Sequence, residues 1–143
     1  MLAQLQKLLN NELTKFEYNG VVFQWDGNQL HISVTGLFIT PTEFTLNDTQ
    51  LLLLRRFINT FNTDEYDTYL VKLDGCIRLV AESDYEQDEL DLNEDGTATV
   101  YSGWSSSDYW DKWLVSSDGN IEYAGTVEGY RRVPEWIRAC TFV

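Results

Sequence analysis

Carboxylate side chains dominate one stretch of the sequence, DYEQDELDLNEDG at residues 84–96, which holds seven Asp or Glu residues and no Lys or Arg. Carboxylates in proteins bind hard cations such as calcium, act in pairs as general acid and base, or form charged surfaces that attract basic partners. The spacing of these acids, and the residues around them, discriminate between the three chemistries.

The segment DLNEDG matches the first half of an EF-hand calcium loop, with Asp91, Asn93 and Asp95 at alternate ligand positions and Gly96 after them. The last position of such a loop requires a glutamate that binds through both oxygens, and Ser102 stands there. The intervening TATVY is typical of a strand. A polar strand end that enters a turn is therefore the favoured interpretation, and Asp91, Asn93 and Asp95 remain a weak candidate metal site.

Carboxylate pairs that hydrolyse glycosides stand roughly 5–10 Å apart, and one of the two has a raised pKa. Nothing in the sequence marks one of these acids as buried. The single histidine, His31, lies in a strand-like segment and has no second histidine with which to build a zinc site. Glycine-rich phosphate loops are absent as well. We therefore expect a protein that is not an enzyme, with no catalytic residues and no cofactor.

The third chemistry is a charged surface, and the alternation in ELDLN favours it. In a strand this pattern directs Leu90 and Leu92 to the core and Glu89, Asp91 and Asn93 outward. Outward side chains on one strand recur about every 6.6–7 Å, close to the roughly 7 Å that separates successive phosphates of one DNA strand. The segment is therefore expected to hold a fixed row of carboxylates that imitates a nucleic-acid backbone.

The net charge of −13 is concentrated in residues 64–95, which carry twelve acids and two bases, Lys72 and Arg78, for a local net charge of −10. Such a field repels nucleic acids and anionic membranes and attracts basic proteins. The expected contact residues are the eight acids of residues 82–95 together with two aromatic residues: Glu82, Asp84, Glu86, Asp88, Glu89, Asp91, Glu94, Asp95, Trp104 and Tyr109.

Aromatic residues gather in YSGWSSSDYWDKW, residues 101–113, which contains three of the five tryptophans. Trp and Tyr dominate binding hot spots, and they also fill cores. Trp104 and Tyr109 flank a run of serines and are expected to be exposed, whereas Trp25 and Trp136 are assigned to core or edge packing. The same cluster supports an alternative function, a sugar or small apolar ligand site lined by Trp104, Tyr109 and Trp110, with calcium at the weak metal site.

The first half of the chain predicts two helices and a hairpin. Apolar residues spaced by three and four predict a helix over 2–16, and two β-rich runs flank Asp26-Gly27. A second helix should begin after Asn47, a good N-cap with Gln50 in the capping-box position, and end near Asn62.

The second half predicts successive hairpins around Asp74-Gly75, Asp95-Gly96 and Asp118-Gly119, each with a type I′ turn, and a short helix that begins near Pro134. The sequence thus predicts one α+β domain over residues 1–143. Its antiparallel meander of about five or six strands, with hairpins at Asp-Gly turns, should pack against the N-terminal and central amphipathic helices.

The N-terminus lacks the pattern of a signal peptide and no apolar run reaches the length of a membrane span, so we expect a cytoplasmic protein whose Cys76 and Cys140 are reduced. The expected function is a small acidic protein-binding module of the inhibitor or immunity-protein kind. It would engage a basic surface, such as that of a nucleic-acid-binding protein, as phage anti-defence nucleic-acid mimics do.

Overall fold

The computed structural model describes residues 1–36, 40–104, 110–125 and 133–138 of the chain. These residues form an α+β fold with three helices and two antiparallel sheets. The smaller sheet has four strands in the order β1-β2-β3-β4, and the larger has six in the order β10-β9-β8-β7-β6-β5. The larger sheet matches the predicted antiparallel meander of five or six strands, whereas the second sheet, which the N-terminal hairpin builds, was not predicted.

The first helix is shorter than predicted. Helix α1 (Leu2–Leu9) stops at the C-cap Asn10, and strand β1 (Lys15–Tyr18) follows. Asn19 and Gly20, with φ values of 50° and 80°, then form the turn to β2 (Val21–Trp25). Positive φ at both central residues is what a type I′ hairpin turn requires, and Asn-Gly is its strongest sequence signal. This turn, together with the apolar residues of β1, outweighs the helical spacing beyond Leu9.

The predicted hairpin around Asp26-Gly27 is confirmed by β2 and β3 (Leu30–Val34), which pair from Trp25↔Leu30 onward. Strand β4 (Thr42–Thr45) adds to the other edge of β3. Alternate side chains of β2 and β3 are buried, so one face of this sheet joins the core.

Helix α2 (Asp48–Phe61) has the predicted ends, with Asn47 as N-cap, Asn62 as C-cap and both hydrogen bonds of the capping box to Gln50. The same two side chains also hold the larger sheet. Asn47 Nδ2 donates to the carbonyl of Gly96 at 2.8 Å, and Gln50 Nε2 donates to the carbonyls of Asn93 and Thr97 at 2.8 and 2.9 Å. The start of α2 is thereby fixed to the loop between β7 and β8.

The larger sheet is a meander, because consecutive strands are neighbours throughout. Its strands are β5 (Asp67–Leu73), β6 (Cys76–Glu82), β7 (Glu86–Asn93), β8 (Ala98–Trp104), β9 (Trp110–Val115) and β10 (Ile121–Tyr123). The three predicted Asp-Gly pairs lie in its loops, but only their glycines have positive φ. The predicted type I′ geometry is therefore wrong at these loops, because it needs positive φ at both residues.

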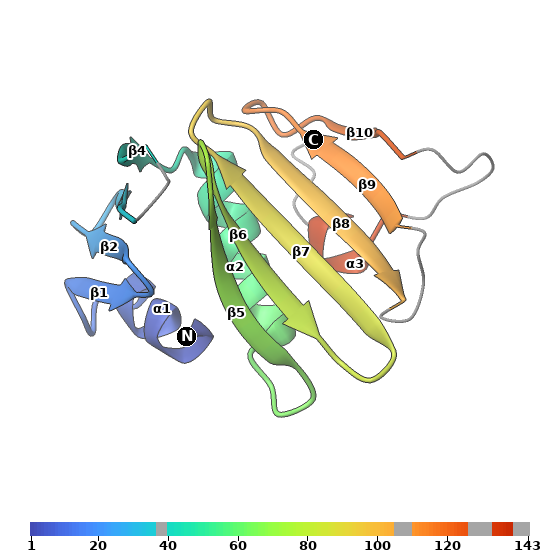
Figure 1. Cartoon of the computed structure of the whole chain (residues 1–143), viewed down its shortest axis with the longest axis horizontal. Helices are drawn as coiled ribbons and strands as arrows, with labels where there is room; N and C mark the ends of the chain where they lie inside the picture. The colour runs from blue at the N-terminus through green and yellow to red at the C-terminus, as the bar shows by residue number, and fades with distance from the viewer. Residues whose placement is uncertain (37–39, 105–109, 126–132, 139–143) are drawn as a thin grey trace.

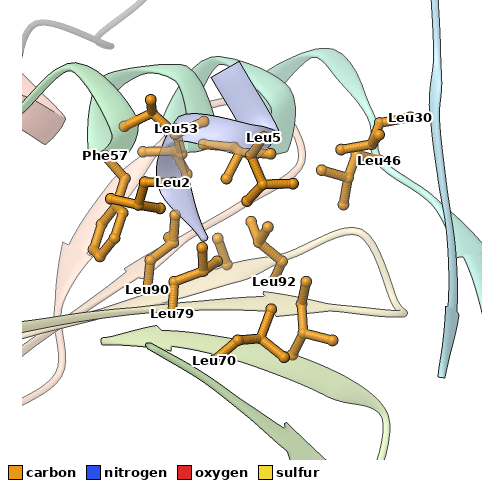
Figure 2. Packing of buried hydrophobic residues seen from close by; sticks show 14 of the residues in the cluster. Leu2, Leu5, Leu30, Leu46, Leu53, Phe57, Leu70, Leu79, Leu90 and Leu92 are labelled. Atoms are coloured by element: carbon orange, nitrogen blue, oxygen red, sulfur yellow. The ribbon is translucent and has the colours of Figure 1, made fainter. Parts of the chain in front are cut away.

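One hydrophobic cluster joins residues of both sheets and all three described helices. Figure 2 shows leucines of α1, α2 and the larger sheet facing one another across this core. The C-terminal helix α3 (Glu135–Arg138) confirms the prediction near Pro134 and adds Trp136, whose ring lies 5.5 Å from Phe57 and 5.8 Å from Phe61. Trp25 and Trp136 are both buried, as predicted.

Lys72 of β5 connects the two sheets by donating from Nζ to the carbonyl of Thr35 at 2.9 Å, close to the β1–β2 turn. A Cβ atom on Gly20 would lie 2.6 Å from this Nζ and 2.8 Å from the Thr35 carbonyl oxygen. We expect Gly20→Ala to lower the free energy of unfolding by about 2 kcal/mol, because a left-handed φ and a backbone clash add together.

Gly27→Ala is the matched control for urea unfolding of the two variants. Gly27 also has a positive φ, 97°, but no atom lies within 4 Å of its added Cβ. The free energy of unfolding of Gly27→Ala should therefore fall by only about 1 kcal/mol, from backbone strain alone. Equal losses in the two variants would contradict a role for the contact between Gly20 and the Thr35–Lys72 pair.

Candidate partner-binding site

The larger sheet has one covered face and one open face. Figure 1 shows α2 and α3 behind this sheet and none of the described helices in front of it. Leu90 and Leu92 point to the covered face and are fully buried, whereas Glu89, Asp91 and Asn93 alternate with them toward the open face. The predicted alternation of this strand is confirmed.

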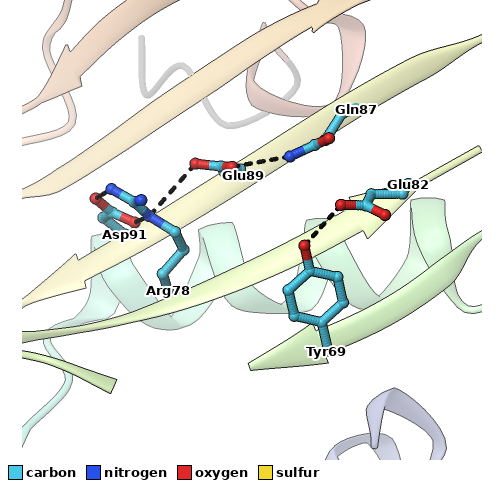
Figure 3. Close-up of polar contacts among 6 residues, drawn as sticks. All are labelled: Tyr69, Arg78, Glu82, Gln87, Glu89 and Asp91. Atoms are coloured by element: carbon cyan, nitrogen blue, oxygen red, sulfur yellow. Dashed lines mark hydrogen bonds and ion pairs between the residues drawn. The ribbon is translucent and has the colours of Figure 1, made fainter. Parts of the chain in front are cut away.

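Two acidic side chains of the open face form ion pairs with an arginine of the same face. Arg78 on β6 donates from Nε and Nη2 to the two carboxylate oxygens of Asp91 at 2.7 and 2.9 Å, and its Nε lies 3.3 Å from Glu89 (Figure 3). Arg78 covers Asp91, which is only 5% exposed although it points outward. A large part of the predicted row of carboxylates is thus an internal ion-pair network rather than a free array.

Tyr101 on β8 extends this network. The guanidinium of Arg78 lies 5.3 Å from the centre of its ring, and Lys112 Nζ lies 5.6 Å from it. Cations at such distances are attracted by the ring face. The centre of the open face therefore carries two cations beside Glu89 and Asp91, and it is not strongly acidic.

Asp88 points the other way, into the core under α3, and is 4% exposed. Burial raises the pKa of its carboxyl to about 6, the charge of Glu86 adds to the rise, and interactions with Ser102 and Trp136 oppose it. Asp88 is two residues from Leu90, so strand alternation directs its side chain to the same covered face. Asp88 was predicted as a contact residue, and the structure places it where a partner cannot touch it.

Glu94 and Asp95 follow the far end of β7, whose last residue, Asn93, lies about 24 Å along the strand from Glu86 at roughly 3.4 Å per residue. Asp95 accepts hydrogen bonds from the backbone and hydroxyl of Thr97 at 2.9 and 2.6 Å, and Asn93 donates to the same hydroxyl. The weak metal candidates Asp91, Asn93 and Asp95 are thus held by separate protein partners. The described residues include no group of three or more acidic, His or Cys side chains that could hold a metal ion.

Five exposed acids and the half-buried Glu82 lie at one end of the larger sheet, where β5 begins and the β6–β7 hairpin turns (Figure 1, bottom of the view). We name this region the acidic end and define it by six carboxylates: Asp64, Glu65, Asp67, Glu82, Asp84 and Glu86. Three of these, Asp64, Glu65 and Asp67, were not predicted as contact residues. A two-residue loop at Asp74-Gly75 pairs Asp67 with Glu82, so the hairpin register could have identified one of them.

Few basic side chains of the described residues neutralise the charge of the acidic end. No Lys or Arg among them forms an ion pair with Asp64, Glu65, Asp67, Glu82 or Glu86. Two tyrosine hydroxyls donate to the carboxylates instead, Tyr66 to Glu86 and Tyr69 to Glu82, both at 2.6 Å. The bond to Glu82 raises the pKa of Tyr69 to about 12. Asp67 and Glu82 stand directly opposite each other on neighbouring strands, an arrangement of like charges that destabilises a sheet.

Tyr85 stands at the tip of the β6–β7 hairpin within the acidic end and is 75% exposed. The turn that presents it is ordered by Ser83, whose Oγ accepts from the backbone amides of Tyr85 and Glu86 at 3.3 and 3.1 Å. Tyr85 is thus an exposed aromatic residue beside these carboxylates, and it was not among the predicted contact residues.

The two predicted aromatic contacts are only partly placed. Trp104 ends β8 opposite Glu86, so its backbone lies at the acidic end. Its side chain, the side chain of Trp110 and all of Tyr109 lie outside the described part of the structure. The sugar-binding alternative depends on these three residues and stays a prediction.

No family model matches this sequence, and searches of curated proteins and of solved structures returned no match either. Among the residues that the structure describes, no helix combines the length and apolar character needed to cross a membrane. The chemistry of the acidic end is therefore the basis on which a function is proposed below.

Proposed function

We propose that this protein is a binding module that recognises a basic protein surface through its acidic end. The observation that carries the proposal is the gathering of six carboxylates from two segments around an exposed tyrosine on an ordered turn; five of them form no ion pair within the described part of the chain. We assign no catalytic role to this end, because Asp88, the carboxyl group with the raised pKa, is only 4% exposed.

Two physical effects favour a basic partner at this place. Uncompensated carboxylates attract cationic surfaces over about 8–10 Å at physiological ionic strength and speed association. In the complex, an arginine or lysine between Asp67 and Glu82 would relieve the repulsion of this cross-strand pair. Tyr85 then supplies an aromatic anchor, the residue type that dominates hot spots and stacks on guanidinium groups.

More specifically, we propose that the protein inhibits a nucleic-acid-binding protein in the cytoplasm. A basic groove that accepts phosphates is complementary to clustered carboxylates, and nucleic acid itself is repelled by the net charge of −13. The free thiol of the described cysteine, Cys76, is compatible with a reducing compartment. In this form DNA or RNA should compete with the protein for its partner.

The test compares two variants of equal net charge. The first removes four charges of the acidic end by Asp67→Asn, Glu82→Gln, Asp84→Asn and Glu86→Gln. The second removes four exposed charges elsewhere by Asp74→Asn, Glu94→Gln, Asp118→Asn and Glu122→Gln. The amides keep acceptors for the two tyrosine hydroxyls, so we expect both variants to fold.

Each variant is used to capture partners from nuclease-treated lysate, and the affinity for the identified partner is then measured by calorimetry at two salt concentrations. We expect the first variant to lose tenfold or more in affinity, roughly 1.4 kcal/mol, while the second stays close to the wild type. Tyr85→Ala should weaken binding without changing its salt dependence. Equal losses in both four-charge variants would show that only net charge matters, and unchanged binding by the first would refute the proposed site.

A further inference from the structure

A second candidate site lies on the helical side of the molecule, between α1 and α2. It is a pocket of about 200 Å³ lined by Gln6 and Leu9 of α1, by the C-cap Asn10, and by Arg55, Ile58 and Asn59 of α2. Its lining holds one guanidinium, three carboxamides and two aliphatic side chains, and no carboxylate. This composition is the reverse of the acidic end, in a chain with 23 acidic residues.

Arg55 lines this pocket, and its guanidinium lies beside an aromatic ring. Its guanidinium lies 5.7 Å from the centre of the Trp25 ring, and Trp25 is itself fixed by burial and by donation from Nε1 to Asn11 Oδ1 at 2.8 Å. Within the described part of the chain no carboxylate forms an ion pair with Arg55. A guanidinium held by an aromatic face keeps its in-plane N–H donors for an oxyanion.

The surrounding amides complement the guanidinium. Gln6 accepts from Asn62 through Oε1 at 3.2 Å, which leaves its Nε2 as a donor, and Asn10 and Asn59 each bring an amide. Leu9 and Ile58, 5% and 2% exposed, form apolar walls that limit competition from water. Donors on an apolar background are typical of small-molecule sites.

The N-terminal part of the chain, which forms this pocket, is close to electrically neutral. Residues 1–62 carry five acids and four bases, a net charge of −1, so the remaining −12 of the total of −13 belongs to residues 63–143. The bases of the first segment are Lys7, Lys15, Arg55 and Arg56. Anions that the larger sheet repels are therefore only weakly repelled here.

We propose that the pocket between α1 and α2 binds the oxyanion of a small molecule, a carboxylate or a phosphate, through Arg55 and the amides of Gln6, Asn10 and Asn59. The volume of about 200 Å³ lies below the roughly 300–1,000 Å³ of sites that enclose drug-sized ligands. The ligand is thus small, or only its anionic group enters. This site is separate from the acidic end, and each proposal can fail without the other.

The experiment titrates the ¹⁵N-labelled protein with inorganic phosphate and, separately, with succinate at constant ionic strength, and follows the indole signal of Trp25 and the side-chain amide signals by NMR. We expect saturable shifts of Trp25 and Asn59, and the tighter of the two anions identifies the oxyanion. Arg55→Gln should weaken binding at least tenfold, about 1.4 kcal/mol, and Arg55→Lys should weaken it less.

Arg56→Gln is the matched control, because Arg56 carries the same charge on the neighbouring position of α2 and does not line the pocket. It should bind as the wild type does. No saturable shift with either anion overturns the proposal, as does equal binding by the wild type and Arg55→Gln. The dispersion of the remaining signals reports whether each variant is folded, so a loss of binding is not confused with unfolding.

Discussion

Arg78→Met is expected to lower the free energy of unfolding by about 3 kcal/mol, because it leaves Asp91 buried without its partner. Asp91 is 5% exposed, and both of its carboxylate oxygens accept from Arg78. Removing one member of a buried ion pair costs more than the pair itself contributes, since the remaining charge keeps its full desolvation penalty. Glu89 and Tyr101 lose their contacts with the guanidinium as well.

A double-mutant cycle with Asp91→Leu isolates this effect. The double variant Arg78→Met with Asp91→Leu should be more stable than Arg78→Met alone, because the buried carboxylate of Asp91 is removed as well and only the more exposed Glu89 lacks its ionic partner. Urea unfolding at neutral pH gives the four free energies, and we expect a coupling of about 2 kcal/mol between the two positions. Strictly additive losses would mean that the network contributes nothing beyond the packing of its separate side chains.

Asp88→Asn is expected to stabilise the protein above pH 6. The pKa of Asp88 is raised from its ordinary value of 3.8 to about 6 in the folded state, because burial under α3 disfavours the charged form. The folded state therefore holds the proton more tightly than the unfolded state does. The free energy of unfolding is therefore unaffected by Asp88 below about pH 4. It falls as the pH rises through 6, by about 3 kcal/mol in all, because the folded state must then bury the charged carboxylate.

Thermal and urea unfolding of both proteins between pH 4 and 8 tests this linkage. The asparagine variant should gain up to about 3 kcal/mol at pH 8, and the difference should vanish near pH 4. Glu94→Gln, at an exposed position directly after the same strand, serves as the control and should change stability by less than about 0.5 kcal/mol at either pH. Parallel pH profiles of the wild type and Asp88→Asn would contradict a buried, charged carboxylate at neutral pH.

The two stability predictions also bear on binding. If the acidic end is the contact surface, Asp88→Asn should leave partner binding unchanged, because its carboxylate is covered by the core and α3. Arg78→Met should preserve binding under conditions in which it stays folded, since Arg78 lies on the open face toward the other end of β6. Loss of binding in these folded variants would move the contact surface from the acidic end to the open face.

Local signals determined the elements that the sequence predicted well. The capping box of Asn47 and Gln50 defines the start of α2 through contacts within one turn, and the alternation around Leu90 and Leu92 defines the two faces of β7. Both signals depend only on residues that are close together in the sequence. The same locality explains the error at α1, where helical spacing and the Asn19-Gly20 turn gave opposite local signals and the hairpin prevailed.

The composition by itself determined that the protein is strongly acidic and that residues 64–95 carry most of the excess charge. Only the tertiary structure decided which of these acids are available to a partner. Strand register brings Arg78 onto Asp91, and α3, from near the other end of the chain, covers Asp88. Meander topology then sends Glu94 and Asp95 to one end of the sheet and gathers Asp67, Glu82 and Glu86 at the other. Charge depends on composition alone, but exposure and pairing depend on contacts between distant segments, which no local pattern encodes.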